Sequence, residues 1–114
     1  MKKITLTLAS MLSLAAFGQS QRTVLLEEFT QASCGPCASA NPAFNKLISA
    51  NVGKVVSIKY QVSWPGSDPM NAQNKTDVSN RVTYYNVQGV PDVSMDGKAT
   101  VSPSAITQTK INTE

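Results

Sequence analysis

The spacing of apolar side chains changes several times along the chain, and each change predicts a different element of secondary structure. Residues 23–30 hold a dense apolar run without clean alternation, which is typical of a strand that is covered on both faces. Residues 54–62 alternate between apolar and polar side chains, which predicts a second strand. The apolar positions of this alternation are Val56, Ile58, Tyr60 and Val62.

A helical spacing separates the two strands. Residues 35–50 place apolar side chains three and four positions apart, so we expect a helix with one buried stripe. This stripe consists of Ala40, Phe44, Leu47 and Ile48. Pro42 lies inside the helix and should kink it, because proline removes one backbone donor. A second helix is expected to begin at Thr76 or Asp77, either of which can cap it, and to reach Tyr85.

The last part of the chain predicts a hairpin and a final helix. Val93–Met95 and Lys98–Val101 flank an Asp-Gly turn, which is a common connection between antiparallel strands. Ser102 can cap the helix that follows, and Pro103 suits its first position. Strands joined through a helix are parallel, whereas the strands of a hairpin are antiparallel. This order therefore predicts an α/β domain with a mixed sheet of about four strands and helices on both faces.

The first 18 residues have the pattern of a targeting segment. Two lysines precede an apolar run at residues 4–17, and small residues at positions 16 and 18 have the spacing that signal peptidase accepts. We therefore expect a secretory signal peptide at residues 1–18 and a single domain at residues 19–114, with a buried N-terminal strand or helix as the alternative. Export predicts the periplasm, and association with the outer membrane or secretion is left open. The sequence also leaves open whether this domain is truncated or is the first domain of a longer protein.

Composition and charge exclude several kinds of function. The chain has ten basic and seven acidic residues, and without the two lysines of the predicted signal it is close to neutral. Charge therefore does not argue for nucleic acid or an anionic membrane as a partner. The absence of histidine excludes Ser–His and Cys–His nucleophilic catalysis. Two cysteines are too few for a closed structural zinc site, and Ala38 after Cys37 excludes covalent haem attachment. We expect no metal and no cofactor.

The only two cysteines lie at the junction between the first strand and the first helix, in Cys34-Gly35-Pro36-Cys37. A helix N-terminus offers unsatisfied N–H groups and the positive end of the peptide dipoles, which stabilise a thiolate on Cys34. Two intervening residues allow one helical turn to bring the sulfurs within bonding range. We therefore predict that Cys34 is an exposed nucleophile and Cys37 the buried resolving thiol. The alternative is a static structural disulfide, although such a short loop would constrain the unfolded chain little.

These residues resemble the thioredoxin-like family. The motif at residues 34–37 is identical to that of thioredoxin, and the strand at Val24–Phe29 matches the strand before it. Pro42 coincides with the proline that kinks the active-site helix of the family, and Tyr84–Pro91 looks like the segment leading to the family's cis-proline. The resemblance covers the chain from Val24 to its end and implies a thioredoxin fold with thiol–disulfide oxidoreductase activity.

The resemblance also implies roles for individual residues near the motif. Pro91 would be a cis-proline beside the disulfide, and it would expose the backbone of Val90 for pairing with an extended substrate peptide. The alternative for Pro91 is an ordinary trans proline that opens an edge strand. Gly35 and Pro36 would form part of the substrate-binding surface.

Glu28 occupies the position where thioredoxins carry a buried acid. A buried carboxylate there could accept the proton of Cys37 during exchange. Glu27 and Glu28 are adjacent and point to opposite faces of the strand, so we expect only one of them to face inward. The alternative for Glu28 is a solvated acid at the end of a strand. Lys59 falls where the family often has a lysine beneath the acid, and its alternative is an exposed strand lysine.

The sequence departs from standard thioredoxins in three places. Ser33 replaces the tryptophan that usually precedes the first cysteine, and Asp92 replaces the threonine that usually follows the proline. Residues 63–74 form a longer, polar insertion, whose Trp64 could line the substrate groove or simply anchor a surface loop. The Trp-Pro-Gly and Asp-Pro-Met elements of this insertion look similar to exported bacterial thioredoxin-like proteins associated with the outer membrane.

Two hypotheses of different classes follow for the function. The first is an enzyme of the cell envelope, a thiol–disulfide oxidoreductase that acts on protein disulfides and draws on a redox donor, with Cys34 attacking and Cys37 resolving the mixed disulfide. The second is a non-catalytic binding or structural module of the envelope that keeps the fold and a stable disulfide. In both cases we expect a monomer.

Overall fold

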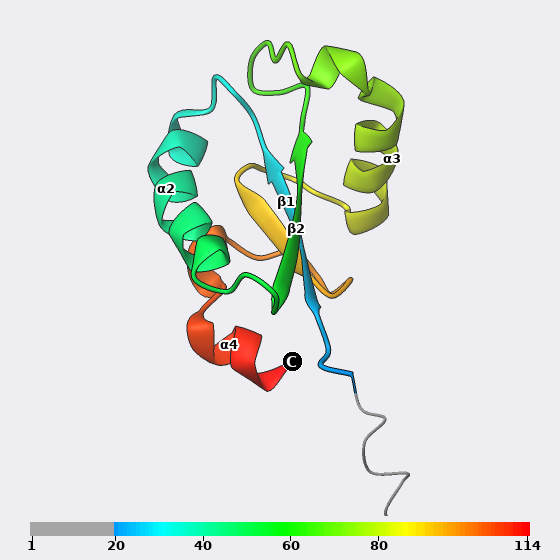
Figure 1. Cartoon of the computed structure of the whole chain (residues 1–114). Helices are drawn as coiled ribbons and strands as arrows, with labels where there is room; N and C mark the ends of the chain where they lie inside the picture. Colours follow the sequence, from blue (N-terminus) through cyan, green and yellow to red (C-terminus); the bar gives the residue numbers. More distant parts are fainter. Residues whose placement is uncertain (1–19) are drawn as a thin grey trace, which may run out of the picture.

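The computed structural model describes residues 20–114, and the predicted signal peptide lies outside the described residues. Strand β1 (Val24–Thr30) occupies the centre of a mixed sheet with the order β2-β1-β3 (Figure 1). Strand β2 (Val55–Gln61) runs parallel to β1, and strand β3 (Asp92–Met95) runs antiparallel to it. The predicted mixed sheet is therefore confirmed. Within residues 20–114 it has three strands instead of about four.

The expected fourth strand, Lys98–Val101, is reduced to a single bridge. Val93 and Val101 exchange both backbone hydrogen bonds, at 2.8 and 2.9 Å. The rest of the segment forms a turn, in which the Lys98 N–H donates to the Met95 carbonyl (3.1 Å) and the Ser94 hydroxyl donates to the Lys98 carbonyl (2.7 Å). Pro103 then begins the short 3₁₀ turn η3 (Pro103–Ala105), which carries the chain away from the sheet.

Helices cover both faces of the sheet, as the sequence predicts. Helix α2 (Gly35–Ser49) lies on one face together with α4 (Gln108–Thr113), and α3 (Lys75–Tyr85) lies on the other (Figure 1). Pro42 is accommodated inside α2. The single final helix expected after Ser102 is wrong, because η3 is followed by a separate helix, α4, whose N-terminus is capped by the Thr107 side chain. No helix within residues 20–114 has the length and apolar character to cross a membrane.

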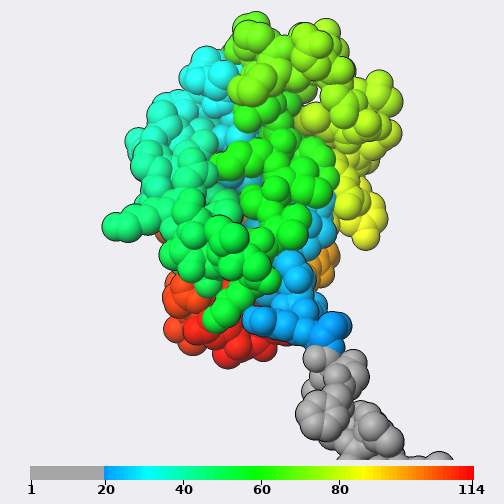
Figure 2. Space-filling view, in the orientation of Figure 1, coloured from blue at the N-terminus to red at the C-terminus, as the bar shows by residue number. Residues whose placement is uncertain are grey.

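Each face of the sheet has its own apolar cluster. The cluster under α2 and α4 consists of Val24, Leu26, Phe44, Val55, Val93, Met95, Ile106 and Ile111. The cluster under α3 consists of Phe29, Val62, Val78 and Val87. Figure 2 shows the opposite ends of the molecule, with α4 beside the start of β1 at one end and the insertion at the other. The insertion includes the 3₁₀ turn η2 (Asn71–Gln73).

Both acidic residues of β1 are buried, and the expectation that only one of them faces inward is wrong. Glu27 is 1% exposed and Glu28 is fully buried. Adjacent strand residues do point to opposite faces, but here helices cover both faces, so neither side chain reaches water. A buried carboxylate is costly without hydrogen bonds and an opposite charge, and each of the two has its own set of partners.

The partners of Glu27 come from β2 and α3. The hydroxyl of Tyr60 donates to its carboxylate at 2.9 Å, the hydroxyl of Tyr85 donates to the other oxygen, and Arg81 forms an ion pair at 3.0 Å. Burial raises the pKa of both phenols, and the Glu27 carboxylate raises each pKa further. This cluster joins three elements on the face of the sheet opposite the cysteines.

We predict that the Tyr85 hydroxyl stabilises the fold only while it keeps its proton. Because the pKa of Tyr85 is raised in the folded state, its contribution is complete below pH ~10, the value of a free tyrosine, and is lost as pH rises through the folded pKa. Tyr85→Phe should cost about 1.5 kcal/mol at pH 8 and clearly less at pH ~11. Urea unfolding at both pH values measures this difference.

Tyr84→Phe is the matched control for this prediction, because Tyr84 is 69% exposed. Its free energy of unfolding should follow that of the wild type at both pH values. A cost of Tyr85→Phe that is equal at both pH values would contradict the assignment of the neutral phenol as donor to Glu27.

Candidate functional site

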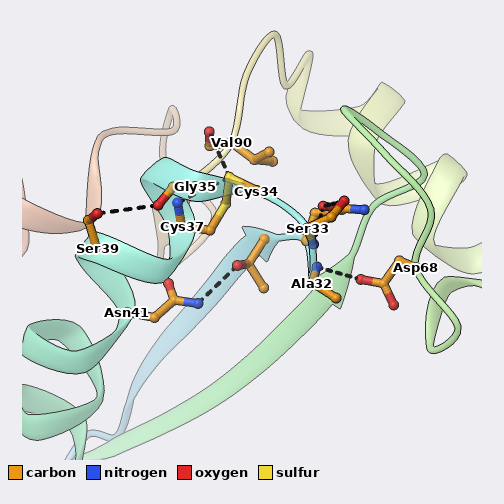
Figure 3. The surroundings of a disulfide bond; sticks show 11 residues. Ala32, Ser33, Cys34, Gly35, Cys37, Ser39, Asn41, Asp68 and Val90 are labelled. Atoms are coloured by element: carbon orange, nitrogen blue, oxygen red, sulfur yellow. Dashed lines mark hydrogen bonds between the residues drawn. A yellow bond between two sulfur atoms is a disulfide. The ribbon is translucent and has the colours of Figure 1, made fainter.

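Cys34 and Cys37 form a disulfide at the N-terminus of α2 (Figure 3). Cys34 is the N-cap of the helix, and Cys37 lies in its first turn, which brings the two Cα atoms to 5.2 Å. The backbone N–H of Cys37 donates to the Cys34 sulfur at 3.1 Å. The sulfur therefore serves as the helix cap and satisfies one of the N–H groups that a helix start leaves free. The same N–H group would stabilise a thiolate on Cys34 after reduction.

Both sulfur-bearing residues are buried in the disulfide form. Cys34 is 3% exposed and Cys37 is 1% exposed, so the expectation of an exposed Cys34 is wrong for this state. The carbonyl oxygen of Val90 lies 3.7 Å from the Cys34 sulfur and faces it (Figure 3). Gly35 and Pro36 are exposed and form the outer surface of the motif.

Val90 and Pro91 come from a distant part of the sequence and border the disulfide. The Val90–Pro91 peptide bond is cis, and β3 begins at the next residue. Both residues are partly exposed. A disulfide sulfur carries no hydrogen, so its approach to the Val90 carbonyl is a contact, whereas a reduced Cys34 thiol would have an acceptor there. The structure also has a second cis bond, Trp64–Pro65, which the sequence analysis did not anticipate.

Glu28 lies beneath the first turns of α2. Its carboxylate forms an ion pair with Lys59, which projects from the neighbouring position of β2. The Asn41 amide lies between the helix and β1, and Figure 3 draws its nitrogen toward the Thr30 hydroxyl. With the amide turned over, its nitrogen donates to Glu28 Oε1 (2.6 Å) and to the Cys37 carbonyl (3.2 Å), and its oxygen accepts from Thr30 (3.1 Å). This orientation satisfies every group around the amide.

Asn41 is thus a site residue that the sequence analysis missed. Its nitrogen connects the buried carboxylate of Glu28 to the backbone of Cys37. The available signal was its spacing, because a residue four positions after Cys37 in a helix lies on the same helix face. A polar side chain on the buried side of an otherwise apolar helix stripe would have indicated a buried acceptor.

The insertion at residues 63–74 holds the loop that precedes Cys34. Asp68 is 6% exposed, and its carboxylate accepts from the backbone N–H of Ala32 at 2.9 Å (Figure 3). The Gln31 side chain accepts from both the backbone N–H (2.7 Å) and the hydroxyl (2.8 Å) of Ser33. Gly66 lies so close to Ser33 that a Cβ atom added to this glycine would collide with the Ser33 hydroxyl. The sequence analysis noted the Trp-Pro-Gly and Asp-Pro-Met elements but predicted no role for Gly66 or Asp68 in holding this loop.

Trp64 lies on the α3 side of the site. Its side chain is partly buried and packs against the apolar cluster under α3, as Val90 does. It also lines a groove of about 470 Å³ between the insertion and α3. The structure therefore brings Cys34, Cys37, Val90 and Pro91 together, with Glu28 behind them, and places Trp64 beside this group.

No protein-family model matches the sequence, and no curated protein matches it. Solved structures do resemble the fold. A crystal structure of a protein from Agrobacterium tumefaciens matches with a TM-score of 0.63 and 21% identity, over 84% of this chain and 46% of that one. The oxidised thioredoxin of Plasmodium falciparum matches with a TM-score of 0.52 and 24% identity, over 82% of this chain and 83% of that one.

Oxidised thioredoxin O2 of Arabidopsis thaliana matches with a TM-score of 0.50 and 21% identity, over 92% of this chain and 83% of that one. These likenesses show that the chain has a thioredoxin-like α/β fold, as the sequence predicts. They also show that it spans less than half the length of the Agrobacterium protein. At such identities a common fold does not by itself establish a common activity.

The contact between Gly66 and Ser33 yields a second prediction. Gly66→Ala should destabilise the fold by about 1–2 kcal/mol, because the new Cβ atom must displace the Ser33 hydroxyl. The cost should be smaller in a Ser33→Ala background, which removes the oxygen that is struck. Urea unfolding of the four members of this double-mutant cycle measures the coupling.

Gly89→Ala is the control for this cycle. Gly89 belongs to the segment that leads to Val90, yet a Cβ atom added there would meet nothing within 4 Å. It should change the free energy of unfolding little. If Gly66→Ala lowers the free energy of unfolding equally in the wild-type and Ser33→Ala backgrounds, the close packing of the insertion on the loop before Cys34 is contradicted.

Proposed function

We propose that this protein is a thiol–disulfide oxidoreductase of the cell envelope that acts on disulfides of other proteins. One observation carries the proposal: the cysteine pair lies at a helix N-terminus where a backbone N–H group points at the Cys34 sulfur. This placement lowers the free energy of the Cys34 thiolate, which is both the attacking and the leaving species in disulfide exchange. The thioredoxin-like fold and the border formed by Val90 and Pro91 support it further.

The proposed reaction has two steps. The reduced Cys34 thiolate attacks one sulfur of the client disulfide, forms a mixed disulfide with it and releases the other client sulfur as a thiolate. Cys37 then loses its proton and attacks the Cys34 sulfur, which closes the Cys34–Cys37 bond and releases the second client thiolate. The client gains two electrons and two protons, and the protein loses two electrons. A thiol donor returns them for the next cycle, and the reverse sequence would oxidise a client dithiol.

Glu28 is the group that we propose as the proton acceptor for Cys37. Its carboxylate is fully buried, and the turned Asn41 amide connects it to the backbone of Cys37. Lys59 holds the carboxylate from below and compensates its charge. The proton would pass from the Cys37 sulfur to Glu28, and Glu28 would later return it to solvent.

We propose that the client binds across the exposed surface around the motif. Val90 can pair with an extended client segment through its backbone, as in the addition of a strand to a sheet edge. Gly35 and Pro36 are exposed beside the sulfurs and offer little steric obstruction. Trp64 would contact the client on the side of α3.

The proposed location in the envelope depends on the signal-like pattern of residues 1–18. An oxidising compartment supplies clients with disulfides, and a cysteine pair that acts there as a reductant must be kept reduced by a donor. The proposed partners are therefore protein thiols and disulfides of the periplasm. Association with the outer membrane and secretion remain two forms of the same proposal.

Trapping of mixed disulfides tests this function. Cys37→Ser should stop the reaction after the first step, so that reduced variant protein accumulates covalent adducts with client proteins or with insulin. Non-reducing electrophoresis should show these adducts, and dithiothreitol should remove them. Cys34→Ser is the matched control and should form none. If Cys37→Ser forms no adduct and the wild type does not accelerate insulin reduction, the proposed activity is wrong.

The burial of both sulfurs favours a second candidate, a non-catalytic module with a stable disulfide. The two functions differ in how easily the bond is reduced. For the oxidoreductase, mild reduction at neutral pH should make Cys34 react rapidly with iodoacetamide, and the reduction potential should lie near that of thioredoxin, about −270 mV. A potential far below this value together with an unreactive Cys34 would establish the structural module instead.

A further inference from the structure

The groove between the insertion and α3 is not used by the disulfide chemistry. Its volume is about 470 Å³, and an indole and two valines supply its apolar wall. These residues are Trp64, Val78 and Val82. Val78 and Val82 occur one helical turn apart on α3, so they present one continuous apolar surface. A groove of this kind and size can hold a large apolar side chain.

The charged groups at this groove are Lys75 and Asp68. Both oxygens of the Asp68 carboxylate are occupied by backbone N–H groups, those of Ala32 on one side and of Met70 and Asn71 on the other. Lys75 is exposed, and it forms no ion pair with any residue between positions 20 and 114. The charged group of the groove that is available to pair with a ligand is therefore the Lys75 ammonium.

The groove adjoins the cysteine loop through direct contacts. Asp68, which lines the groove, accepts a hydrogen bond from the backbone N–H of Ala32. Gly66 packs on Ser33, the residue before Cys34. Figure 3 shows the insertion next to this loop, with Asp68 directed at Ala32. A polypeptide joined to Cys34 by a disulfide can therefore reach the groove within a few residues, since an extended chain advances about 3.3 Å per residue.

We propose that this groove is a specificity pocket for client proteins, and that it selects an apolar side chain followed by a carboxylate near the reacting cysteine. The apolar side chain would pack against Trp64, Val78 and Val82, and the carboxylate would pair with Lys75. This inference rests on the proposed oxidoreductase function and adds the class of client to it. It also gives the insertion a role, because the insertion supplies Trp64 and fixes the groove next to the disulfide.

Peptide disulfides of known sequence test the pocket. Each peptide carries one cysteine as a mixed disulfide with thionitrobenzoate, and a Leu-Glu pair is moved stepwise along either side of that cysteine. Protein reduced with dithiothreitol and then desalted attacks the peptide sulfur, and thionitrobenzoate leaves as a coloured thiolate. In at least one register, the Leu-Glu peptide should react about fivefold faster than the matched Leu-Lys and Ser-Glu peptides.

Charge reversal at the groove should change this preference. Lys75→Glu should abolish or invert the ratio between Leu-Glu and Leu-Lys peptides. Lys54→Glu is the matched control, because Lys54 is also exposed but lies just before β2, at the end of that strand remote from the insertion, and it should leave the ratio unchanged. Lys75 is exposed, so its replacement leaves the packing of α3 intact.

The outcomes separate the pocket from the chemistry. Normal release of thionitrobenzoate with no preference in any register, or a preference that survives Lys75→Glu, would overturn the pocket and leave the proposed activity standing. If the reduced wild type reacts with none of the peptides and not with the free dithiobis-nitrobenzoate reagent, the proposed activity is wrong, and the pocket with it.

Discussion

The burial of β1 on both faces is the constraint on which the rest of the structure depends. A central strand with two adjacent carboxylates must provide each of them with donors, since a carboxylate away from water is costly. Glu27 is satisfied by Tyr60, Tyr85 and Arg81, and Glu28 by Lys59 and Asn41. These partners connect the strand to both flanking helices. The position of α2, and of the cysteine pair at its start, thus follows partly from electrostatic pairing beneath it.

The elements that sequence reasoning predicted well are those determined by local pattern. The strand before the cysteines, the helix that follows them and the existence of β2 depend on the spacing of side chains within one segment. The partner strand after Lys98 is reduced to one bridge, and the turn contacts of Lys98 with Met95 and Ser94 that take its place are not visible in the local pattern. The cover of β1 on both faces was predicted, but the burial of both acids was not, because the side chains that stabilise them come from elements distant in the sequence.

The same distinction holds for the site. The cysteine motif can be identified from four consecutive residues, and the neighbouring cis-proline from a short segment and a family resemblance. Asn41 and Asp68, in contrast, act through contacts with Glu28 and with the Ala32 backbone that arise only when strands and loops are assembled. The insertion can be recognised in the sequence as a polar segment that is longer than in standard thioredoxins. Its attachment to the loop before Cys34 is a property of the three-dimensional structure.

The sulfur of Cys34 has one further consequence as the cap of α2. This sulfur accepts a hydrogen bond from the backbone N–H of Cys37 in the first helical turn. A thiolate accepts this hydrogen bond more strongly than a disulfide sulfur, because it carries a full negative charge. Thermodynamic coupling is reciprocal, so whatever tightens the start of the helix must also favour the electron-rich form of the sulfur. The order of the first turn of α2 therefore helps to determine how readily the disulfide is reduced.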